Sequence, residues 1–335
     1  MQTATGARIL LTHAPQIRAL YYRQGPQDAL AALGTLTRHE REEELSPAEL
    51  IAAAQGAQVI VAHRATPVPA EAFAALPDLV AVVRCAMDTR NIAIPAASAA
   101  GVLVTHASPG FVPAVAELAV GMMIDLGRGI SGYVGRYRAG GEPPQAMGRQ
   151  LSGAVLGILG YGAIGRHLGR LGTALGMEVL AADPFVTGAE PGVALRPMAE
   201  VLARADFLVC LVVANDSTDN LMNAAAFAAM KRGSCFLNLS RGQLVDEAAL
   251  EAALDSGHLA GAAMDVGRHG DQMPPPRLAA RANVVATPHI GGLTQQAVDH
   301  QAFETTRQVA AILRGAAPPG SMNAEAASRL ARMRG

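Results

Sequence analysis

Short apolar runs alternate with helical patterns along this chain of 335 residues. The runs are rich in Val, Ile, Leu and Ala, as expected for strands buried on both faces of a parallel sheet. Over about the first hundred residues they predict strands at 9–12, 58–62, 79–83 and 102–104, with a helix at 70–76. Because strands alternate with helices, this part of the chain is expected to form one α/β lobe.

A second series of strands follows Val112–Leu126, which has the pattern of a long apolar helix. Helices such as Glu247–Ser256 separate these strands, so a second parallel sheet is expected. The final helix, from 295 to about 315, has no sheet of its own and is expected to pack on the first lobe. The predicted strands of the second lobe are 155–159, 179–182, 207–213, 234–238, 262–266 and 284–286.

Three polar segments lie outside this alternation. The acidic stretch Glu40–Glu44 is interpreted as a solvated helix or loop face with no function of its own. Residues 132–150 are rich in Gly, Pro and Arg and are expected to form an exposed arm. The basic tail at 329–334 is interpreted as a frayed end rather than a binding site.

Composition narrows the class of protein. Half of the residues are hydrophobic, 16% are charged and the formal net charge is −1, which argues against nucleic-acid or membrane-surface partners. No signal peptide or membrane-spanning run is apparent, so a cytoplasmic location is expected. Cys85, Cys210 and Cys235 show no metal-ligand spacing and are interpreted as small core residues in a reducing compartment, with no metal site.

One motif carries the strongest chemical signal. Gly160, Gly162 and Gly165 form a Gly-x-Gly-x-x-Gly turn between the strand 155–159 and a helical pattern. In a dinucleotide-binding turn, the first glycine permits the tight turn and the second lets a pyrophosphate approach the backbone. The third lets the helix pack closely on the strand. Because strand, turn, helix and a later acidic residue all occur in order, dinucleotide binding is favoured over a chance match.

That acidic residue is Asp183, which ends the next predicted strand eighteen residues after Gly165. Its carboxylate can accept both hydroxyls of an adenosine ribose and would repel a 2′-phosphate. The residues that follow, Pro184, Phe185 and Val186, supply no cation to hold such a phosphate. The sequence therefore predicts NAD rather than NADP as the cofactor.

Three polar residues follow later strands of the same lobe. Arg241 can hold a carboxylate through its planar guanidinium, although a surface Arg in a helix-capping turn is the commoner case. His289 stands between a proline and a glycine pair, which allows close approach of a ligand. Asp265 could accept a hydrogen bond from the carboxamide of a nicotinamide. These residues are expected at the carboxyl ends of the strands, in a cleft between the lobes.

At this point the chain resembles the D-isomer-specific 2-hydroxyacid dehydrogenase family, over nearly its whole length. The resemblance implies a cofactor lobe, 105–294, inserted into a discontinuous substrate lobe, 1–104 and 295–335. It also implies a homodimer formed through the cofactor lobe. The motifs that carry it are Val115-Ala116-Glu117, LGYGAIG at 159–165, Thr218, NLSRGQLVDEAAL at 238–250, MDV at 264–266, TPHIGGLT at 287–294 and Asn323.

By this resemblance the protein interconverts a 2-oxo acid and a D-2-hydroxy acid with NAD. Arg241 would hold the substrate carboxylate and stabilise charge on its carbonyl oxygen, and His289 would act as general acid and base. The implied cofactor-binding residues are Gly160, Tyr161, Gly162, Ala163, Ile164, Gly165, Asp183, Val213, Thr218, Leu239, Arg241, Asp265, His289 and Gly291.

The chain departs from the family at the partner of the catalytic histidine. Family members place a Glu five residues after the Asp of the MDV stretch, and here that position is Gly270. Asp271 is the preferred replacement, Gln272 is the alternative, and a third possibility is that His289 works without such a partner.

A second departure concerns the substrate loop after the third strand, where Ala86-Met87-Asp88 replaces the family's glycine-rich sequence. Asp88 would repel an anionic substrate unless Arg84 or Arg90 neutralises it, or unless the substrate carries a polar or cationic group. The alternative is that Asp88 only caps a turn.

Two further hypotheses follow from these departures. One is a phosphoglycerate-, formate- or phosphite-type dehydrogenase of the same family. The other is an NAD-binding sensor or corepressor-like protein whose catalysis has decayed. The remaining histidines are not predicted site residues, and five of them lie in no motif: His13, His39, His63, His258 and His300.

Overall fold

The computed structural model describes residues 6–334, apart from the side chain of Asp271. It divides into two compact units. Unit 1 joins the chain up to Gly110 to the chain from Gln295, and unit 2 is Phe111–Thr294. Residues 105–110 thus belong to unit 1, whereas the sequence placed them in the cofactor lobe. The expected α/β class with two parallel sheets is confirmed.

Unit 1 is built on a five-stranded sheet of order β2-β1-β3-β4-β5, in which every neighbouring pair is parallel. The sequence analysis did not predict the edge strand β2, because this strand is polar and half exposed rather than an apolar run. The strands are β1 (Arg8–Leu11), β2 (Thr35–Arg38), β3 (Val59–Ala62), β4 (Ala81–Arg84) and β5 (Leu103–His106).

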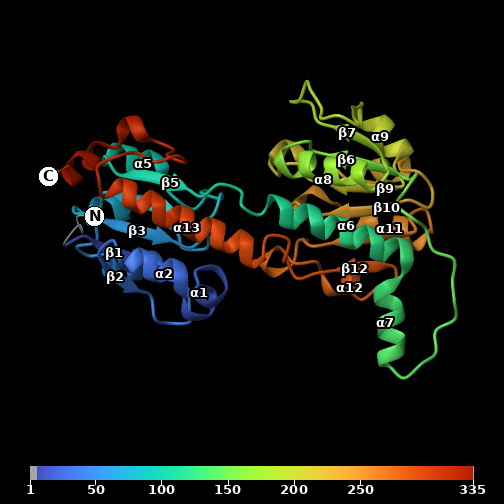
Figure 1. Cartoon of the computed structure of the whole chain (residues 1–335), viewed down its shortest axis with the longest axis horizontal. Helices are drawn as coiled ribbons and strands as arrows, with labels where there is room; N and C mark the ends of the chain where they lie inside the picture. The colour runs from blue at the N-terminus through green and yellow to red at the C-terminus, as the bar shows by residue number, and fades with distance from the viewer. Residues whose placement is uncertain (1–5, 335) are drawn as a thin grey trace. The chain divides into compact units, whose positions relative to one another are not determined.

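Helices cover both faces of this sheet and bury two separate apolar clusters. Helices α3, α4 and α5 supply Leu50, Phe73 and Ala97 to one cluster. The last long helix, α13, packs against α2 and β4 on the other face and supplies Val309 and Ile312 (Figure 1). The helices are α1 (Pro15–Tyr21), α2 (Gln24–Ala31), α3 (Pro47–Ala53), α4 (Ala70–Ala75), α5 (Ile94–Ala99) and α13 (Gln295–Ile312).

The basic tail is ordered, so its interpretation as a frayed end was wrong. It forms the 3₁₀ turns η4 (Ala324–Ala326) and η5 (Ser328–Met333). Leu330 is buried, and Arg329 donates hydrogen bonds to the carbonyls of Leu76 and Leu79 at 2.8 and 2.9 Å. Arg329, whose charge suggested a solvated tail, thus satisfies two backbone carbonyl groups of unit 1.

Unit 2 carries a seven-stranded parallel sheet of order β12-β11-β10-β9-β6-β7-β8. The chain builds outward from β6 to β8 and then returns to build from β9 to β12 on the other side. The direction of winding therefore reverses between β6 and β9, the position where such sheets bind ligands. The strands are β6 (Val155–Leu159), β7 (Glu178–Ala182), β8 (Val193–Leu195), β9 (Phe207–Cys210), β10 (Cys235–Asn238), β11 (Gly261–Met264) and β12 (Val284–Ala286).

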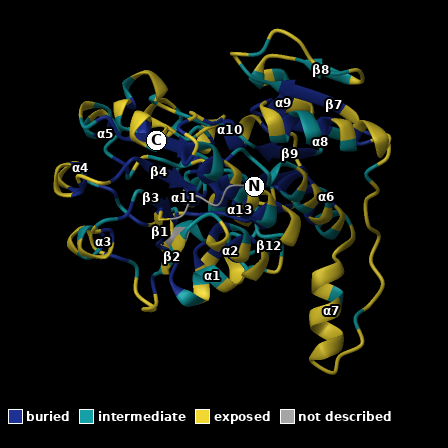
Figure 2. Ribbon diagram, turned by 60° about the vertical axis from the view of Figure 1, so that its left-hand side comes forward, coloured by how far each residue is buried: buried dark blue, intermediate teal, exposed yellow. Residues whose placement is uncertain are grey.

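Both faces of the unit 2 sheet are also covered, which explains why its central strands are almost entirely buried (Figure 2). Helices α6 and α8 pack one face, and helices α9, α10 and α11 pack the other. The helices are α6 (Val112–Arg128), α7 (Ile130–Arg138), α8 (Ala163–Ala174), α9 (Met198–Arg204), α10 (Ala224–Ala229), α11 (Glu247–Asp255) and α12 (Pro276–Ala279).

The expected exposed arm is partly helical. Gly129, in the left-handed conformation at φ +67°, separates α6 from α7, and α7 buries none of its residues (Figure 2). The chain then runs along the surface and returns to α6, where the backbone N–H of Arg149 donates to the carbonyl of Gly127 at 2.7 Å. The arm is thus held at both ends, while its middle has few contacts within unit 2.

The three cysteines are free and buried, in agreement with their interpretation as core residues. Burial raises the pKa of the Cys210 thiol to about 11. Within residues 6–334, no helix combines the length and apolar character needed to cross a membrane.

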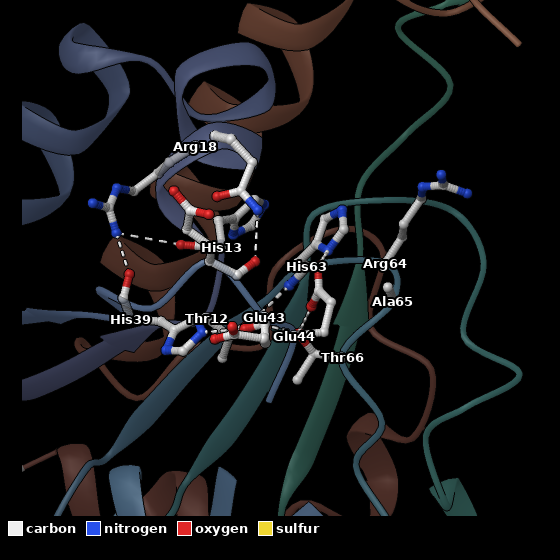
Figure 3. Close-up of polar contacts among 12 residues, drawn as sticks. Thr12, His13, Arg18, His39, Glu43, Glu44, His63, Arg64, Ala65 and Thr66 are labelled. Carbon is white, nitrogen blue, oxygen red and sulfur yellow. Dashed lines mark hydrogen bonds and ion pairs between the residues drawn. The ribbon is translucent and has the colours of Figure 1, made fainter. Parts of the chain in front are cut away.

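His13, which follows β1 and lies near His63 (Figure 3), is the one histidine of unit 1 with no exposed surface. Neither ring nitrogen has a hydrogen-bond partner in the described structure. Burial, together with the nearby His63, Arg84 and Arg18, lowers the pKa of His13 well below its usual value of 6.5. His13 is therefore neutral in the folded protein.

The burial of His13 predicts that the free energy of unfolding depends on pH. Below pH 6.5 the unfolded chain binds a proton at His13 that the folded protein does not. The free energy of unfolding should fall there by up to about 1.4 kcal/mol per pH unit from this residue. His13→Leu should flatten the decline between pH 6.5 and 5 in urea unfolding, and the exposed control His269→Gln should leave it unchanged. An undiminished decline in His13→Leu would contradict this assignment.

Candidate active site

The predicted site residues of unit 2 lie at one edge of its sheet. Because all of its strands are parallel, the loops after their carboxyl ends emerge on the same side. Six such loops, after β6, β7, β9, β10, β11 and β12, carry these residues. The loops hold Gly160–Gly165, Asp183, Val213–Thr218, Leu239–Arg241, Asp265 and His289–Gly291, respectively.

The glycine turn has the close approaches that its sequence predicts. Gly160 adopts φ +88°, and a Cβ atom there would lie 2.7 Å from the backbone of Leu211, after β9. A Cβ atom on Gly165 would lie 2.4 Å from the carbonyl oxygen of Gly160. Both positions require glycine for the turn itself.

Gly162 differs from these two because a Cβ atom there would meet nothing within 4 Å. It is the N-cap of α8, and no side chain caps that helix. The first-turn N–H groups and the positive end of the helix dipole therefore face open space. This arrangement fits a pyrophosphate, which needs backbone donors and no intervening side chain.

Hydrogen bonds connect Asp183 to the glycine turn. One carboxylate oxygen accepts the N–H of Tyr161 at 2.8 Å and the other accepts the N–H of Phe185 at 2.9 Å. Each oxygen keeps a further lone pair, so the carboxylate can still accept ribose hydroxyls. Asp183 thus joins the loop after β6 to the loop after β7.

On the other side of the turn, the loop after β9 presents Val213, which is 77% exposed. The hydroxyl of Thr218 accepts from the N–H of Asn215 and donates to the carbonyl of Val213, both at 2.9 Å. Thr218 therefore shapes this loop through contacts of its own, and its predicted contact with the cofactor stays a prediction.

Arg241 is positioned by a residue that the sequence did not single out. Asn238, the buried last residue of β10, donates from its amide to the carbonyl of Arg241 at 2.9 Å and accepts the N–H of Ser240 at 3.1 Å. Ser240 in turn donates to the carbonyl of Val212 at 2.5 Å. These bonds fix the backbone from which the half-buried Arg241 side chain extends.

His289 is held in an uncommon backbone conformation. Its φ is +55°, in the left-handed region that costs a bulky residue about 1 kcal/mol or more. Its N–H donates to the carbonyl of Asp265 at 3.0 Å. Such a conformation persists only where the surroundings over-determine it, and it is typical of functional sites.

The surroundings here are dominated by the carboxylate of Asp265, which is almost fully buried. It accepts from the hydroxyl of Thr287 at 2.6 Å and from the N–H groups of Ile290 and Gly291 at 2.8 Å each. These donors flank His289 on both sides, so Asp265 holds the loop. Its predicted bond to a nicotinamide carboxamide stays a prediction, with most of its acceptor capacity already used.

Asp271 and Gln272 are the two predicted partners of His289. The side chain of Asp271 lies outside them, so its predicted role stays a prediction. Gln272 has φ +59°, and its side-chain oxygen is buried without a hydrogen-bond donor among the described residues. Gln272 therefore does not bind His289 through that oxygen.

In unit 1, the loop Ala86–Met87–Asp88 follows β4. Asp88 forms a two-pronged ion pair with Arg90, with Nε–Oδ1 at 3.0 Å and Nη2–Oδ2 at 2.7 Å. It also accepts the N–H of Arg90 at 3.0 Å, so it caps the turn as well. Arg90 thus neutralises Asp88, whereas Arg84 is buried and directed to other acceptors.

The positioning residues Asn238 and Asp265 share one sequence signal, a polar side chain where a buried strand ends. That signal identified Asp265 as a candidate site residue, but it did not predict that Asp265 holds the loop of His289. Within the described residues, no three His, Cys, Asp or Glu side chains gather as metal ligands do.

Comparisons with known proteins identify the family of this chain. The family model described as "D-isomer specific 2-hydroxyacid dehydrogenase, NAD binding domain" matches residues 120–291. The chain is 35% identical to D-3-phosphoglycerate dehydrogenase of Rattus norvegicus over 292 residues, which is 85% of the chain and 54% of that protein. It therefore spans about half the length of this relative.

Two further proteins match over most of their length. (S)-Sulfolactate dehydrogenase of Chromohalobacter salexigens is 35% identical over 267 residues, covering 78% of the chain and 86% of that protein. The structure of D-lactate dehydrogenase with NAD⁺ from Lactobacillus jensenii superimposes with a TM-score of 0.80 at 24% identity, over 94% of this chain and 99% of that one, and so supports the fold. The chain therefore belongs to the D-isomer specific 2-hydroxyacid dehydrogenase family, and residues 120–291 match the NAD-binding domain of that family.

Proposed function

We propose that this protein is an NAD-dependent dehydrogenase that interconverts a 2-oxo acid and a D-2-hydroxy acid. The observation that carries the proposal is the geometry around Gly162. An uncapped helix N-terminus faces open space there, and Arg241 and His289 follow strands at the same sheet edge. A position for the cofactor pyrophosphate and a general acid, His289, at the same edge suit hydride transfer to a 2-oxo acid.

Arg241 would bind the substrate carboxylate through its guanidinium and stabilise negative charge on the carbonyl oxygen. Asn238 fixes the backbone of Arg241, so the side chain that carries the guanidinium extends from a rigid position. When bound, NADH supplies the hydride that reaches C2 of the oxo acid.

His289 would donate a proton to the carbonyl oxygen during reduction and accept it during oxidation. The fixed loop limits the positions its imidazole can reach, which favours one geometry of proton transfer. We keep Asp271 as its proposed partner and Ala86–Met87–Asp88 as the proposed substrate loop. A cytoplasmic location also stays a prediction.

We also propose that the arm of unit 2 binds a second copy of this chain. Helix α7 buries no residue, and it exposes Ile130, Val134 and Tyr137. Met147, further along the arm, is fully exposed. Met147 also lines an open pocket of about 320 Å³ between the arm and the end of α6, together with Leu126. Exposed apolar side chains of this kind commonly mark protein interfaces.

Gly162→Ala separates folding from cofactor binding. The new methyl group meets no protein atom within 4 Å, so the melting temperature should stay close to that of the wild type. The methyl group would stand where the pyrophosphate approaches, so we expect NADH affinity to fall about tenfold or more in fluorescence titrations. Gly165→Ala, with its 2.4 Å approach, should instead lower the melting temperature. Unchanged NADH affinity in Gly162→Ala would argue against this cofactor position.

His289→Asn tests the proposed chemistry. A panel of 2-oxo acids should include at least one that oxidises NADH, followed by its absorbance. Removal of the general acid should lower kcat by about 10²–10⁴-fold while NADH still binds. The exposed His269→Gln on a nearby loop should retain activity. If NADH binds but the wild type reduces no oxo acid, the enzyme proposal fails and the sensor hypothesis gains.

Tyr137→Glu tests the arm. A charge on this exposed face would have to be desolvated in an interface, so the variant should elute as a monomer where the wild type elutes as a dimer. Light scattering coupled to gel filtration gives the mass. Leu20→Glu, at a similarly exposed apolar position in unit 1, should remain dimeric. A dimeric Tyr137→Glu protein, or a monomeric wild type, would refute the proposed interface.

A further inference from the structure

Arg268 joins three of the loops at the carboxyl edge of the unit 2 sheet. It lies in the loop after β11, and its Nη2 donates to the carbonyl of Gln243 at 2.7 Å and to Oδ1 of Asn220 at 2.8 Å. Its Nε donates to the carbonyl of Val245 at 3.2 Å. Gln243 and Val245 follow β10 and Asn220 follows β9, so one side chain holds all three loops together.

The carbonyl and amide acceptors carry most of this contact. Arg268 also pairs with Asp219 at 3.2 Å, but the two side chains are 40% and 46% exposed, and such ion pairs contribute little. The acceptors are themselves fixed, because the N–H of Asn220 donates to the carbonyl of Gln243 at 2.8 Å. Asn220 has φ +51°, a conformation that Asn tolerates better than most residues.

The turn that Arg268 holds begins next to Arg241. Gly242 directly follows Arg241 and starts a single 3₁₀ turn. A Cβ atom on Gly242 would lie 2.0 Å from the carbonyl carbon of Gly267, so the backbones of the loops after β10 and β11 are in direct contact. Arg268 follows Gly267 and donates to the carbonyl of Gln243, and its side chain thus keeps these two backbones together.

The loop after β11 is held by contacts outside itself. It contains Gly267 and one short 3₁₀ turn, Gly270–Gln272, and glycine loses more conformational freedom on folding than any other residue. Gln272 adopts φ +59°, and its side-chain oxygen is buried without a hydrogen-bond donor among the described residues. Each of these features disfavours the observed conformation, which therefore depends on its surroundings.

Glu247 supplies a second anchor for the same residue. Its carboxylate is buried at the start of α11, where Oε1 accepts the backbone N–H of Arg268 at 2.9 Å and Oε2 accepts from Nη2 of Arg277 at 3.0 Å. The backbone of Arg268 is thus fixed by Glu247, while its side chain reaches the loops after β9 and β10. Arg268 has a defined position from both ends.

The proposed partner of His289 lies within the anchored segment. The N–H of Gly267 donates to the carbonyl of Gln272 at 2.7 Å, which closes the loop around residues 268–271. Asp271 is therefore joined to Arg268 through a short closed stretch of backbone. The anchors on Arg268 limit the positions that the backbone of Asp271 can take.

We propose that Arg268 is a positioning residue for the proposed reaction: it holds the turn of Arg241 and the loop of Asp271 in one arrangement. In this role it acts through Arg241, which would bind the substrate carboxylate, and touches neither substrate nor cofactor itself. The proposal rests on the proposed function. Arg268 lies outside the motifs that carry the family resemblance, because MDV ends at Val266 and TPHIGGLT begins at Thr287.

Arg268→Gln tests this role in the reduction of an accepted 2-oxo acid. The variant loses the guanidinium contacts and keeps the backbone bond to Glu247. The KM for the oxo acid should rise about tenfold, because Arg241 no longer binds the carboxylate from a fixed turn. The affinity for NADH should stay within about threefold, since the glycine turn and Asp183 lie after β6 and β7. A lower kcat with an unchanged KM would indicate a merely structural role and overturn the proposal.

Two further variants separate geometry from charge. Arg204→Gln removes the same charge from an arginine of nearly equal exposure, 41% against 40%, which pairs with Glu178 at the amino end of β7. It should leave the KM within about twofold of the wild type. Arg268→Lys keeps the charge but lacks the planar guanidinium that binds several acceptors at once, so its KM should match that of Arg268→Gln. An equal rise in Arg204→Gln, or a wild-type KM in Arg268→Lys, would overturn the proposal.

Asn220→Gly covers the case in which Arg268→Gln does not fold. Glycine adopts the φ of +51° at this position without strain, and the variant removes the side-chain oxygen that accepts from Arg268. The KM for the oxo acid should rise in the same direction, by about threefold. An unchanged KM in the folded Asn220→Gly protein would overturn the proposal.

Hydrogen exchange tests the same contact without turnover. In Arg268→Gln, peptides that cover residues 240–246 and 266–275 should exchange about tenfold faster than in the wild type, whereas the peptide of the glycine turn, 156–166, should be unchanged. Unchanged exchange in the first two peptides would overturn the proposal. If the wild type reduces no oxo acid, the proposed function fails, and the exchange result still decides whether Arg268 holds these loops.

Discussion

In both sheets every strand runs parallel to its neighbours, and the chemistry of the protein depends on this constraint. Parallel pairing requires the chain to return to the same end of the sheet before each strand, through a helix in every connection except that between β7 and β8, so all carboxyl ends reach the same edge. In unit 2 this brings together loops that are far apart in sequence, from the glycine turn after β6 to the histidine loop after β12. In unit 1 the same rule brings the rings of His13 and His63, after β1 and β3, within 5.1 Å of each other.

Buried polar residues at the strand ends hold the loops of this shared edge in fixed positions. Asn238 at the end of β10 holds the backbone of Arg241, and Asp265 after β11 holds the loop of His289. Arg84 at the end of β4 does the same for the loop after β3. In each case a side chain satisfies backbone groups of a loop that has no regular structure, which keeps that loop rigid in a buried setting.

Sequence patterns predicted most strands of both sheets, but they missed the polar edge strand β2 and the three-residue edge strand β8. They also found Gly160, Gly162 and Gly165, since each glycine has a local physical task. They missed the contacts among His13, His63 and Glu44, because these residues lie in three segments with no motif. The acidic stretch was interpreted as solvated, which holds for its exposed residues, whereas Glu44 turns inward to His63. Only tertiary structure reveals that contact.

The central claim is that the glycine turn, Arg241 and His289 together direct a hydride to C2 of a 2-oxo acid. The most direct test is reduction of an accepted 2-oxo acid with NADH that carries deuterium at the transferred position of C4. The account predicts a 2-hydroxy acid with one deuterium at C2, present as the D enantiomer alone. Loss of the label to water, or a mixture of enantiomers, would contradict it.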